Sequence, residues 1–353
     1  MITDILGLVT NMTDLRTRTH QPAGLDLPPD MVRRLIEDTY GIRPSALHFF
    51  SAELATVCRV ETPSGPLGFK AQRADSVDPA VFAWQAEVQA HAAAAGLPAP
   101  TPIAAATTGH LTTTAHVADE TVLLQLYTWR DGMPLSRVLP DQRVAREVGR
   151  TAARLSVALA PLAPPPGDTG HMWELSRAAD TIRRVLPDVA DAQIAALARA
   201  AADRFEAELA GLSALPHQVV HHDLHDSNLL VAQTRAEWIV SGMLDFGDAV
   251  WGARVAELAV TAAYVARHGS DPLGAIADVC GGWRDAAPLS ESEMLAVLPG
   301  ALTRLAVNAA VWASRARGAR AEYARERAVG STRALAALSG IPTMRLVDLV
   351  AAL

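Results

Sequence analysis

Two short polar runs, each enclosed by apolar residues, constrain this sequence more than any other feature. Residues 221–228 read His-His-Asp-Leu-His-Asp-Ser-Asn, and residues 244–248 read Leu-Asp-Phe-Gly-Asp. The flanking runs, 219–220, 229–231 and 238–244, are short and apolar, which predicts buried strands. Both polar runs therefore lie where buried strands end, and such strand ends are where a rigid scaffold presents catalytic groups.

The residue types in these runs are those that phosphoryl transfer needs. Asp223 offers a carboxylate that accepts a proton from a hydroxyl group, and Asn228 follows it with an amide oxygen for a divalent metal ion. Asp245 offers a second oxygen ligand from the neighbouring strand end. Because magnesium prefers hard oxygen ligands, Asn228 and Asp245 together predict a Mg²⁺ site.

The distribution of basic residues points to the same chemistry. Of the 31 lysine and arginine residues, 30 are arginine, and Lys70 is the only lysine. A lysine ammonium is a compact point charge, whereas an arginine guanidinium is a planar fork, so the two do not replace each other at every site. A kinase needs a cation on a strand of its small lobe to contact the nucleotide phosphates, and Lys70 stands at the end of a predicted strand.

The first part of the chain has the pattern of a small sheet with accompanying helices. Apolar residues at helical spacing follow Pro28 and Pro29 and stop at Gly41, which predicts a short helix. Further along, the pattern predicts strands at 47–50, 57–60 and 67–70, a hairpin turn at 62–66, a helix at 79–95 and a strand at 121–129.

Helical spacing dominates the second part. Val144–Leu159 is one amphipathic helix, two alanine-rich helices are expected within 174–211, and helices continue from 245 to the C-terminus. The strand-rich segment 219–244 interrupts this pattern with one hairpin. The sequence thus predicts an α+β protein with a small sheet-containing lobe, a short connector near 125–132 and a mostly helical lobe.

The expected boundaries follow from these changes in pattern. Residues 1–27 show no clear periodicity and are interpreted as an N-terminal arm. Residues 28–128 form the predicted N-lobe, which binds nucleotide, and residues 129–353 form the predicted C-lobe with the catalytic and metal-binding loops. A chain of 353 residues is long enough to bury a sizeable core in each lobe.

Composition excludes several classes of partner. The formal net charge is −7 at pH 7, so no basic field exists to hold a nucleic-acid backbone. The longest apolar stretch, 294–314, contains Pro299 and Arg304, and we expect these residues to interrupt it before it spans a bilayer. Cys58 and Cys280 stand far apart in apolar sequence, which fits buried thiols in a reducing cytoplasm.

On these motifs the chain resembles the aminoglycoside phosphotransferase and choline kinase superfamily. The resemblance rests on the His-x-Asp-x4-Asn loop at 221–228, the Asp-Phe-Gly-Asp run at 245–248 and the upstream Lys70, and it covers roughly residues 30–345. The run 242–248, with the segments 257–264 and 302–312, is most similar to hydroxylysine kinase and its bacterial relatives. The resemblance implies a bilobal protein-kinase-like fold with a small antiparallel-sheet N-lobe and a mostly helical C-lobe.

The resemblance also implies a role for individual residues. Asp223 is the implied catalytic aspartate, Asn228 and Asp245 are the implied Mg²⁺ ligands, and Lys70 is the implied phosphate contact. The remaining nucleotide contacts implied are Ser51 in the covering loop 51–56, Gln125 and Tyr127 in the connector, and either Gln85 or Glu87 as the partner of Lys70.

Two positions depart from the superfamily pattern. The catalytic loop usually has glycine where this chain has His222, and the covering loop 51–56 contains no glycine. A glycine-free loop makes a phosphate cradle of backbone amides harder to form. These departures keep open the alternative of a pseudokinase that binds nucleotide and regulates a partner.

The acceptor is expected to be a small molecule with a hydroxyl group, and the co-substrate ATP or GTP. Asp248 and Glu257 are expected to contact an ammonium group, and arginines near 304 and 315 a carboxylate, which suits an amine or amino-acid acceptor. Trp312 is a candidate for the substrate wall, although its helical spacing also fits a core residue.

Two further readings of the motifs remain open. A polycationic antibiotic acceptor would make the chain an aminoglycoside O-phosphotransferase that confers resistance, and such an acceptor calls for an acidic pocket. Alternatively, His217, His221, His222 and His225 with Asp223 would form a zinc site. Pro216 and the β-branched pair 219–220 disfavour the helix that an i, i+4 histidine pair requires.

Overall fold

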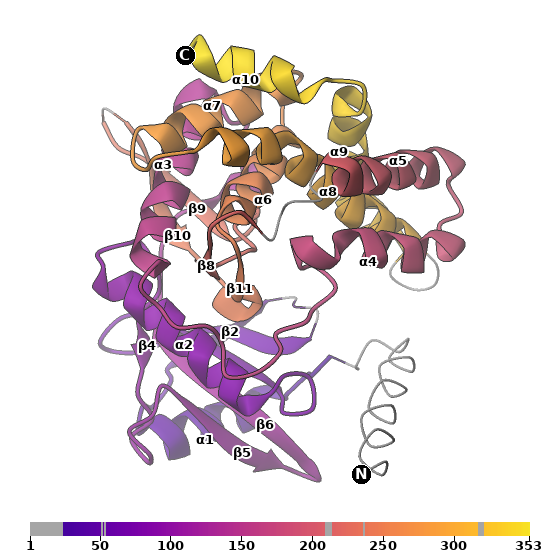
Figure 1. Cartoon of the computed structure of the whole chain (residues 1–353). Helices are drawn as coiled ribbons and strands as arrows, with labels where there is room; N and C mark the ends of the chain where they lie inside the picture. The colour runs from indigo at the N-terminus through magenta and orange to yellow at the C-terminus, as the bar shows by residue number, and fades with distance from the viewer. Residues whose placement is uncertain (1–23, 51, 53, 209–213, 236, 317–320) are drawn as a thin grey trace, which may run out of the picture. The chain divides into compact units, whose positions relative to one another are not determined.

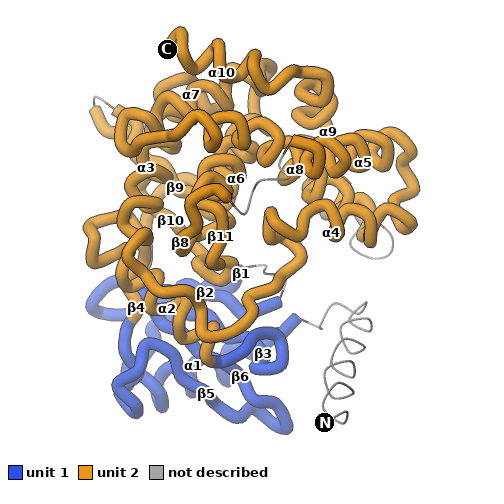
Figure 2. Tube along the Cα trace, in the orientation of Figure 1, with its two compact units in different colours: residues 1–79, 103–127 blue, residues 80–102, 128–353 orange. Residues whose placement is uncertain are grey.

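The computed structural model describes residues 24–353 apart from 51, 53, 209–213, 236 and 317–320. Within these residues the chain divides into two compact units, drawn in blue and orange in Figure 2. Unit 1 comprises residues 1–79 and 103–127, and unit 2 comprises residues 80–102 and 128–353. Each unit has its own hydrophobic core.

Unit 1 is built on an antiparallel sheet with one helix (Figure 1). Helix α1 (Pro29–Tyr40) ends at Gly41, which adopts φ +67°, a conformation that glycine accepts without strain. The strand order is β1-β2-β3-β6-β4, with β5 paired to β6. The strands are β1 (Ala46–Phe50), β2 (Ala55–Glu61), β3 (Leu67–Arg73), β4 (Pro102–Ile103), β5 (Thr112–Val117) and β6 (Glu120–Thr128).

Alternation along the strands of unit 1 separates a core face from an opposite face. Phe69 and Ala71 of β3 are fully buried in the core of unit 1, together with Leu124 and Leu126 of β6. Leu25 also packs into this core, so the end of the expected N-terminal arm contributes to it. Because side chains alternate along a strand, the residues between these core positions face the other side of the sheet.

Unit 2 is mostly helical, with short strand pairs inserted. Strands β9 and β10 form the expected hairpin and pair with β7, while β8 pairs with β11. The strands are β7 (Met133–Pro134), β8 (His217–Val220), β9 (Leu229–Gln233), β10 (Trp238–Met243) and β11 (Val250–Ala253). The helices are α2 (Pro79–Ala94), α3 (Gln142–Leu159), α4 (Ala178–Val185), α5 (Ala192–Glu208), α6 (Val255–Ala266), α7 (Pro272–Arg284), α8 (Glu291–Ser314), α9 (Ala321–Leu338) and α10 (Thr343–Ala351).

Helix α2 is grouped with the helical unit, whereas the boundaries expected from the sequence place it with the sheet. The reason is packing, since Val88 and Ala92 of α2 are buried in the core of unit 2. The two cysteines, Cys58 and Cys280, are free and buried, as expected. Burial raises the pKa of both thiols to about 12.

Helix α8 corrects one expectation. The prediction that Pro299 and Arg304 interrupt the apolar stretch is wrong, because α8 runs unbroken for 24 residues through both positions. A capping box between Ser290 and Glu293 starts the helix. By length and composition α8 is able to cross a membrane. Its most apolar 18-residue stretch, however, is 94% buried inside the structure, as in the core helix of a globular protein. Arg304 tolerates this burial because it is paired, as described below.

Candidate active site

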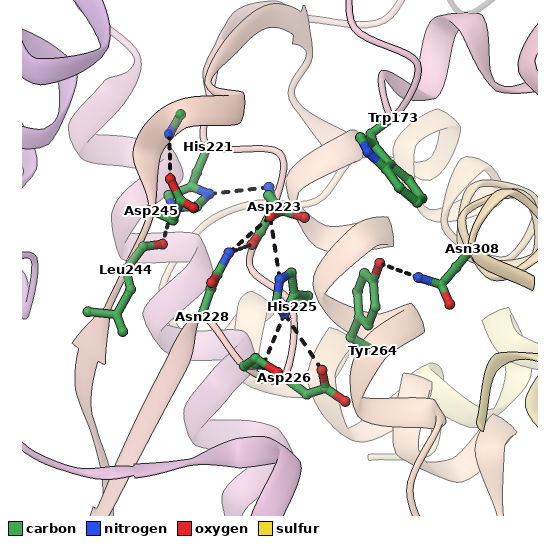
Figure 3. A network of polar contacts seen from close by, with 12 residues as sticks. Trp173, His221, Asp223, His225, Asp226, Asn228, Leu244, Asp245, Tyr264 and Asn308 are labelled. Carbon is green, nitrogen blue, oxygen red and sulfur yellow. Dashed lines mark hydrogen bonds and ion pairs between the residues drawn. The ribbon is translucent and has the colours of Figure 1, made fainter. Parts of the chain in front are cut away.

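The register of the β9–β10 hairpin brings the two polar runs together. Leu229 pairs with Met243 at the end of the hairpin, and the backbone N–H of Leu244 donates to the carbonyl of Asn228 at 2.8 Å. Asn228 and Asp245 therefore leave adjacent strand ends side by side, as Figure 3 shows. The sequence prediction that these runs meet at one edge of the strands agrees with this geometry.

The Asp223 carboxylate is held at both oxygens. Nδ2 of Asn228 donates to Oδ2 at 2.9 Å, and Nη2 of Arg304 donates to Oδ1 at 2.7 Å. Nδ1 of His221 also accepts from the backbone N–H of Asp223 at 3.2 Å. Arg304 is 2% exposed, so the guanidinium side of the ion pair with Asp223 is shielded from water. Bonds to both oxygens fix the direction in which the carboxylate points.

Burial raises the pKa of Asp223 to about 6. The negative charges of Asp248 and Asp245 act in the same direction, while His225 and Arg304 oppose them. A carboxylate with a pKa near 6 is ionised at neutral pH and yet more basic than an exposed aspartate. These are the properties of a general base that takes a proton from a hydroxyl group.

Asp245 begins a tight turn that is fixed against helix α2. It adopts φ +57°, and its Oδ1 accepts from the backbone N–H of Gly247 at 3.2 Å. Aspartate tolerates this left-handed conformation because its short side chain bonds to the local backbone. Nε2 of Gln85, from α2, donates to the carbonyl of Gly247 at 2.5 Å.

The residues present at this turn fit a divalent cation. Because the amide nitrogen of Asn228 donates to Asp223, the acceptor oxygen of that amide is the atom left for coordination, and Asp245 adds a carboxylate on the adjacent strand end. Oxygen donors of this kind suit Mg²⁺. In the part of the chain that the structure describes, no group of three or more His, Cys, Asp or Glu side chains is arranged to hold a metal ion. A cation bound here would be held by the Asn228 and Asp245 oxygens and would need further oxygen ligands.

Glu257 binds the backbone of the loop that carries Asp223. Its Oε2 accepts from the backbone N–H of His221 at 2.6 Å, and the carboxyl is 0% exposed. Burial raises the pKa of Glu257 to about 7, and the N–H groups of His221 and His222 only partly offset this effect. The structure therefore brings Glu257 to the loop backbone and away from solvent, and we assign it a supporting role in place of the expected acceptor contact.

His221 links the two polar runs. Its Nε2 contacts the carbonyl of Leu244 at 3.0 Å, while its Nδ1 accepts from the backbone of Asp223. Burial lowers the pKa of His221 to about 4, so the ring is neutral and carries its proton on Nε2. The contact with the Leu244 carbonyl is thus a hydrogen bond that the histidine donates.

A second carboxylate anchors the other end of the loop. Oδ2 of Asp226 lies 2.9 Å from Nε2 of His268 and 3.6 Å from Nη1 of Arg267. The backbone carbonyl of Asp226 also accepts from the N–H of Ser136 at 2.7 Å. Burial alone would raise the pKa of Asp226, but His225, His268 and Arg267 outweigh it and hold the pKa far below the usual range.

Aromatic side chains surround the guanidinium of Arg304. The guanidinium carbon is 5.4 Å from the centre of the Trp173 ring and 5.5 Å from that of Tyr264. Asn308 donates to the hydroxyl of Tyr264 at 3.2 Å. Figure 3 shows Trp173, Tyr264 and Asn308 on the side of Asp223 away from Asn228. We call this group, with Arg304, the aromatic side of the site.

In unit 1, three of the expected nucleotide contacts share one face of the sheet. Lys70 of β3 alternates with the buried Phe69, and Gln125 and Tyr127 of β6 alternate with buried leucines, so all three lie on the face opposite the core. The Tyr127 ring lies over Gly68, where an added Cβ would come within 2.1 Å of it. Ser51 lies outside the described residues.

The other expected site residues have distinct positions. Gln85 is buried and contacts Gly247, whereas Glu87 is exposed on α2. Asp248 is half-buried in the turn and lies close enough to affect Asp223 electrostatically. Trp312 is buried against α9, in agreement with the core alternative, with Arg315 and Arg327 over its ring at 5.2 and 5.6 Å.

The four histidines considered for zinc have separate partners. His217 is exposed and contacts the carbonyl of Leu215, and His221 bonds the two loops as described. Nε2 of His222 accepts from the N–H of Leu175, and His225 lies between the Asp223 and Asp226 carboxylates. The four histidines therefore have separate polar partners.

The sequence did not predict that Arg304 contacts Asp223. A signal existed, since Arg304 is the only basic residue in the 24-residue helix α8. A lone charge in an apolar helix needs a buried partner. Trp173 gave no signal, because it lies in an irregular segment far from Asp223 in sequence.

Two solved structures similar to this chain show which fold it has. A microcompartment-associated aminopropanol kinase matches with a TM-score of 0.71 and 18% identity, covering 89% of this chain and 99% of that one. An amicoumacin kinase in complex with AMP-PNP, Ca²⁺ and Ami matches with a TM-score of 0.68 and 14% identity, covering 91% and 97%. The fold is therefore the α+β, protein-kinase-like fold that the sequence predicted.

Residues 49–289 match the model of the APH phosphotransferase enzyme family, and the chain belongs to this family. It is also 29% identical over 182 residues to the hydroxylysine kinase of Xenopus laevis, covering 48% of each chain. The matched region thus spans about half the length of that curated relative. The resemblance proposed from the motifs is confirmed at the level of the family.

Proposed function

We propose that the chain is a small-molecule kinase that transfers the γ-phosphoryl group of ATP or GTP to a hydroxyl of a small amine or amino-acid acceptor. The observation that carries this proposal is the Asp223 carboxylate, fixed between Asn228 and Arg304, with a pKa raised to about 6. The match to a hydroxylysine kinase supports an acceptor of this class.

The proposed step is a direct transfer. Asp223 accepts the proton of the acceptor hydroxyl as its oxygen bonds to the γ-phosphorus, and the bond to the bridging oxygen breaks to release a nucleoside diphosphate. Positioning of the base supplies a large part of the acceleration, because little other covalent chemistry is needed. A magnesium ion held by Asn228 and Asp245 would neutralise phosphate charge during the transfer. Lys70 is proposed to contact the phosphates.

Guanidinium groups on the aromatic side and around Trp312 favour an acceptor that carries an anionic group. Arg267 and Arg304 lie over the Tyr264 ring at 5.2 and 5.5 Å, and Arg315 and Arg327 lie over that of Trp312. These guanidinium groups disfavour a polycationic aminoglycoside, although the Asp223 and Asp226 carboxylates neutralise part of the charge of Arg304 and Arg267. This arrangement supports the amino-acid acceptor over the antibiotic.

The test is an acceptor screen that measures release of nucleoside diphosphate with magnesium. We expect turnover with hydroxylated amino acids or amino alcohols and none with aminoglycosides. Asp223→Asn should lower turnover by about 10² to 10⁴ because the proton acceptor is lost, while nucleotide binding, which does not use this carboxylate in the proposed step, is retained. Nucleotide binding without transfer to any acceptor would favour the pseudokinase alternative.

We further propose that the enzyme works in the reducing cytoplasm and binds neither nucleic acid nor membrane. The support is the two free, buried thiols and the net charge of −7. Fractionation of cells that express the tagged protein tests this location.

A further inference from the structure

The residue that precedes Asp223 adopts a backbone conformation that is unfavourable for its type. His222 has φ +67°, and among the non-glycine residues that the structure describes, only Ala118 and Asp245 also have a positive φ. A side chain with a Cβ is strained in this conformation, whereas glycine is not. The histidine side chain must therefore make an interaction that offsets the strain.

That interaction is a hydrogen bond to a distant segment. Nε2 of His222 accepts from the backbone N–H of Leu175 at 3.1 Å, and the ring is 1% exposed. Burial holds the pKa of His222 well below its usual value, and the charge of Arg304 adds to this effect, so the ring is neutral. Leu175 begins a short 3-10 turn (Leu175–Arg177), whose first N–H groups have no partner within the turn.

Arg304 makes a second connection to the same segment. Nη1 donates to the carbonyl of Trp173 at 2.7 Å, and Nη2 donates to Oδ1 of Asp223 at 2.7 Å. One guanidinium thus joins the backbone of Trp173 to the proposed base. The indole of Trp173 lies against the guanidinium at 5.4 Å, which fixes the direction of the fork.

Among the described residues, the other polar groups around these two bonds add one weak contact, from Nη2 of Arg315 to Sδ of Met172 at 3.6 Å. His171 begins the segment, and its ring centre lies 5.9 Å from that of His222. Within the described residues, both ring nitrogens of His171, Nδ1 of His222 and Nε of Arg304 are buried without a hydrogen-bond partner. The polar attachment of segment 171–175 to the loop therefore depends on the bonds from His222 and Arg304.

We propose that His222 and Arg304 are positioning residues, which fasten segment 171–175 to the catalytic loop and so hold the Asp223 carboxylate in line with the acceptor hydroxyl. The proposal rests on the kinase function proposed above. Since Arg304 contacts Oδ1 and Asn228 contacts Oδ2, loss of the fastening displaces the base on the aromatic side. The Asn228 side, where the metal and nucleotide are proposed to bind, keeps its contacts.

Variants of His222 test the proposal. In His222→Gln the amide oxygen reaches about as far as Nε2, so the bond from Leu175 is kept, whereas His222→Asn is too short and His222→Gly has no side chain. We expect Asn and Gly to lower kcat by about 10- to 100-fold, the cost of a displaced base, with the KM for nucleotide changed less than about twofold. His222→Gln should stay within about threefold of wild type. His217→Gln, at an exposed site outside the loop, is the matched control.

A readout that does not require activity separates this proposal from the proposed function. The amide hydrogen of Leu175 should exchange slowly in the wild type and in His222→Gln, and at least about tenfold faster in the Asn and Gly variants. His222→Gly also relieves backbone strain, so its melting temperature should not fall as kcat does. Unchanged Leu175 exchange in the Asn and Gly variants overturns the fastening, whether or not an acceptor is found. Unchanged kcat with accelerated exchange overturns the positioning role.

A double-mutant cycle tests whether the two residues act through one segment. Arg304→Lys keeps the charge and loses the fork, and its effect on kcat is measured alone and with His222→Asn. If both act through segment 171–175, the combined loss is smaller than the product of the single losses. A loss of kcat in the double variant equal to that product overturns the shared role. If Arg304→Lys fails to fold, the variants of His222 still decide the proposal.

Discussion

Lys70 lies with Gln125 and Tyr127 on the face of the sheet opposite the core of unit 1. If its compact charge is needed to place the phosphates, Lys70→Arg should be nearly as damaging as Lys70→Ala although the charge is kept. We expect kcat to fall by about 10²-fold, because a misplacement of about 1 Å has this effect. Turnover, nucleotide affinity and melting temperature measured on both variants check the prediction.

The matched control for this substitution lies on the same strand. Arg73 forms ion pairs with Asp75 and Glu120 at the end of β3, and Arg73→Lys should leave turnover unchanged. Wild-type turnover in Lys70→Arg would show that the lone lysine has no special role.

Glu257 gives a pH dependence of stability with a defined sign. Its folded-state pKa is raised to about 7, so the folded protein holds a proton that the unfolded chain releases near pH 4.5. The contribution of Glu257 is therefore fully present below pH 4.5 and is lost as the pH rises to 7. Glu257→Gln keeps an acceptor for the His221 N–H and has no such loss, so its free energy of unfolding relative to wild type should rise by a few kcal/mol between pH 5 and pH 8. Urea unfolding at both values measures this difference.

A second buried glutamate provides the control with the opposite sign. Burial would raise the pKa of Glu293, but Arg254 and Ser290 outweigh it and the pKa is lowered. Its contribution is present above pH 4.5 and lost as the pH falls, so Glu293→Gln should be more destabilising at pH 8 than at acid pH. If the two variants show the same pH dependence, the electrostatic account of Glu257 is wrong.

At the scale of single residues, the sequence predicted which nearby side chains lie together better than it predicted long-range contacts. Asp223, Asn228 and Asp245 were found from their types and spacing, and the structure brings them together at adjacent strand ends. The contact between Arg304 and Asp223 depends on helix packing across a long stretch of chain, and no local pattern encodes it.

At the scale of elements, two helices of unit 2 approach each other through glycines. An added Cβ at Gly149 of α3 would lie 2.0 Å from the carbonyl oxygen of Val279 in α7. Alanine normally favours a helix by about 1 kcal/mol over glycine, but this contact requires the two backbones to separate. We expect Gly149→Ala to lower the free energy of unfolding by about 2 kcal/mol or more, measured in urea.

Gly340 is the matched control for this prediction. A Cβ there meets nothing within 4 Å, so Gly340→Ala should leave stability within about 0.5 kcal/mol of wild type. Equal effects of the two substitutions would mean that the close packing of α3 on α7 is not what stabilises unit 2.

Strand β5 was not predicted from the sequence pattern, and helix α8 was expected to be interrupted. Three threonines begin β5, which has no fully buried position and pairs with β6, so it lacks the apolar alternation that marks a strand. In α8, tertiary packing on all sides outweighed the local cost of Pro299. Strands β1, β2, β3 and β6 follow apolar runs and were predicted within a few residues, whereas the two-residue strand β4 was not predicted.

At the scale of the whole molecule, ligand binding should appear as stability. A ligand that binds only the folded state stabilises it according to its concentration and affinity. A non-hydrolysable nucleotide with Mg²⁺ should raise the melting temperature by several degrees, and Asp245→Ala should abolish the rise. Asp30→Ala, which removes an exposed carboxylate from α1, is the control and should retain the rise in melting temperature. A full rise in Asp245→Ala would show that Asp245 does not hold the metal ion.

The division into a sheet-containing part and a helical part was visible in the sequence, because the apolar spacing changes from that of strands to that of helices. The fold class is confirmed by the similar structures. The grouping of α2 with the helical unit was not visible, since it depends on which neighbour buries Val88 and Ala92.

Helix α8 has a consequence for the order of events during synthesis. Helices α5 and α6, which cover part of it, are made earlier, but α9, which covers another side, leaves the ribosome only after α8 is complete. In that interval a helix apolar enough to enter a bilayer presents an uncovered side, including Trp312, to the cell. We expect that side of α8 to stay exposed on the nascent chain until α9 has been made and covers it.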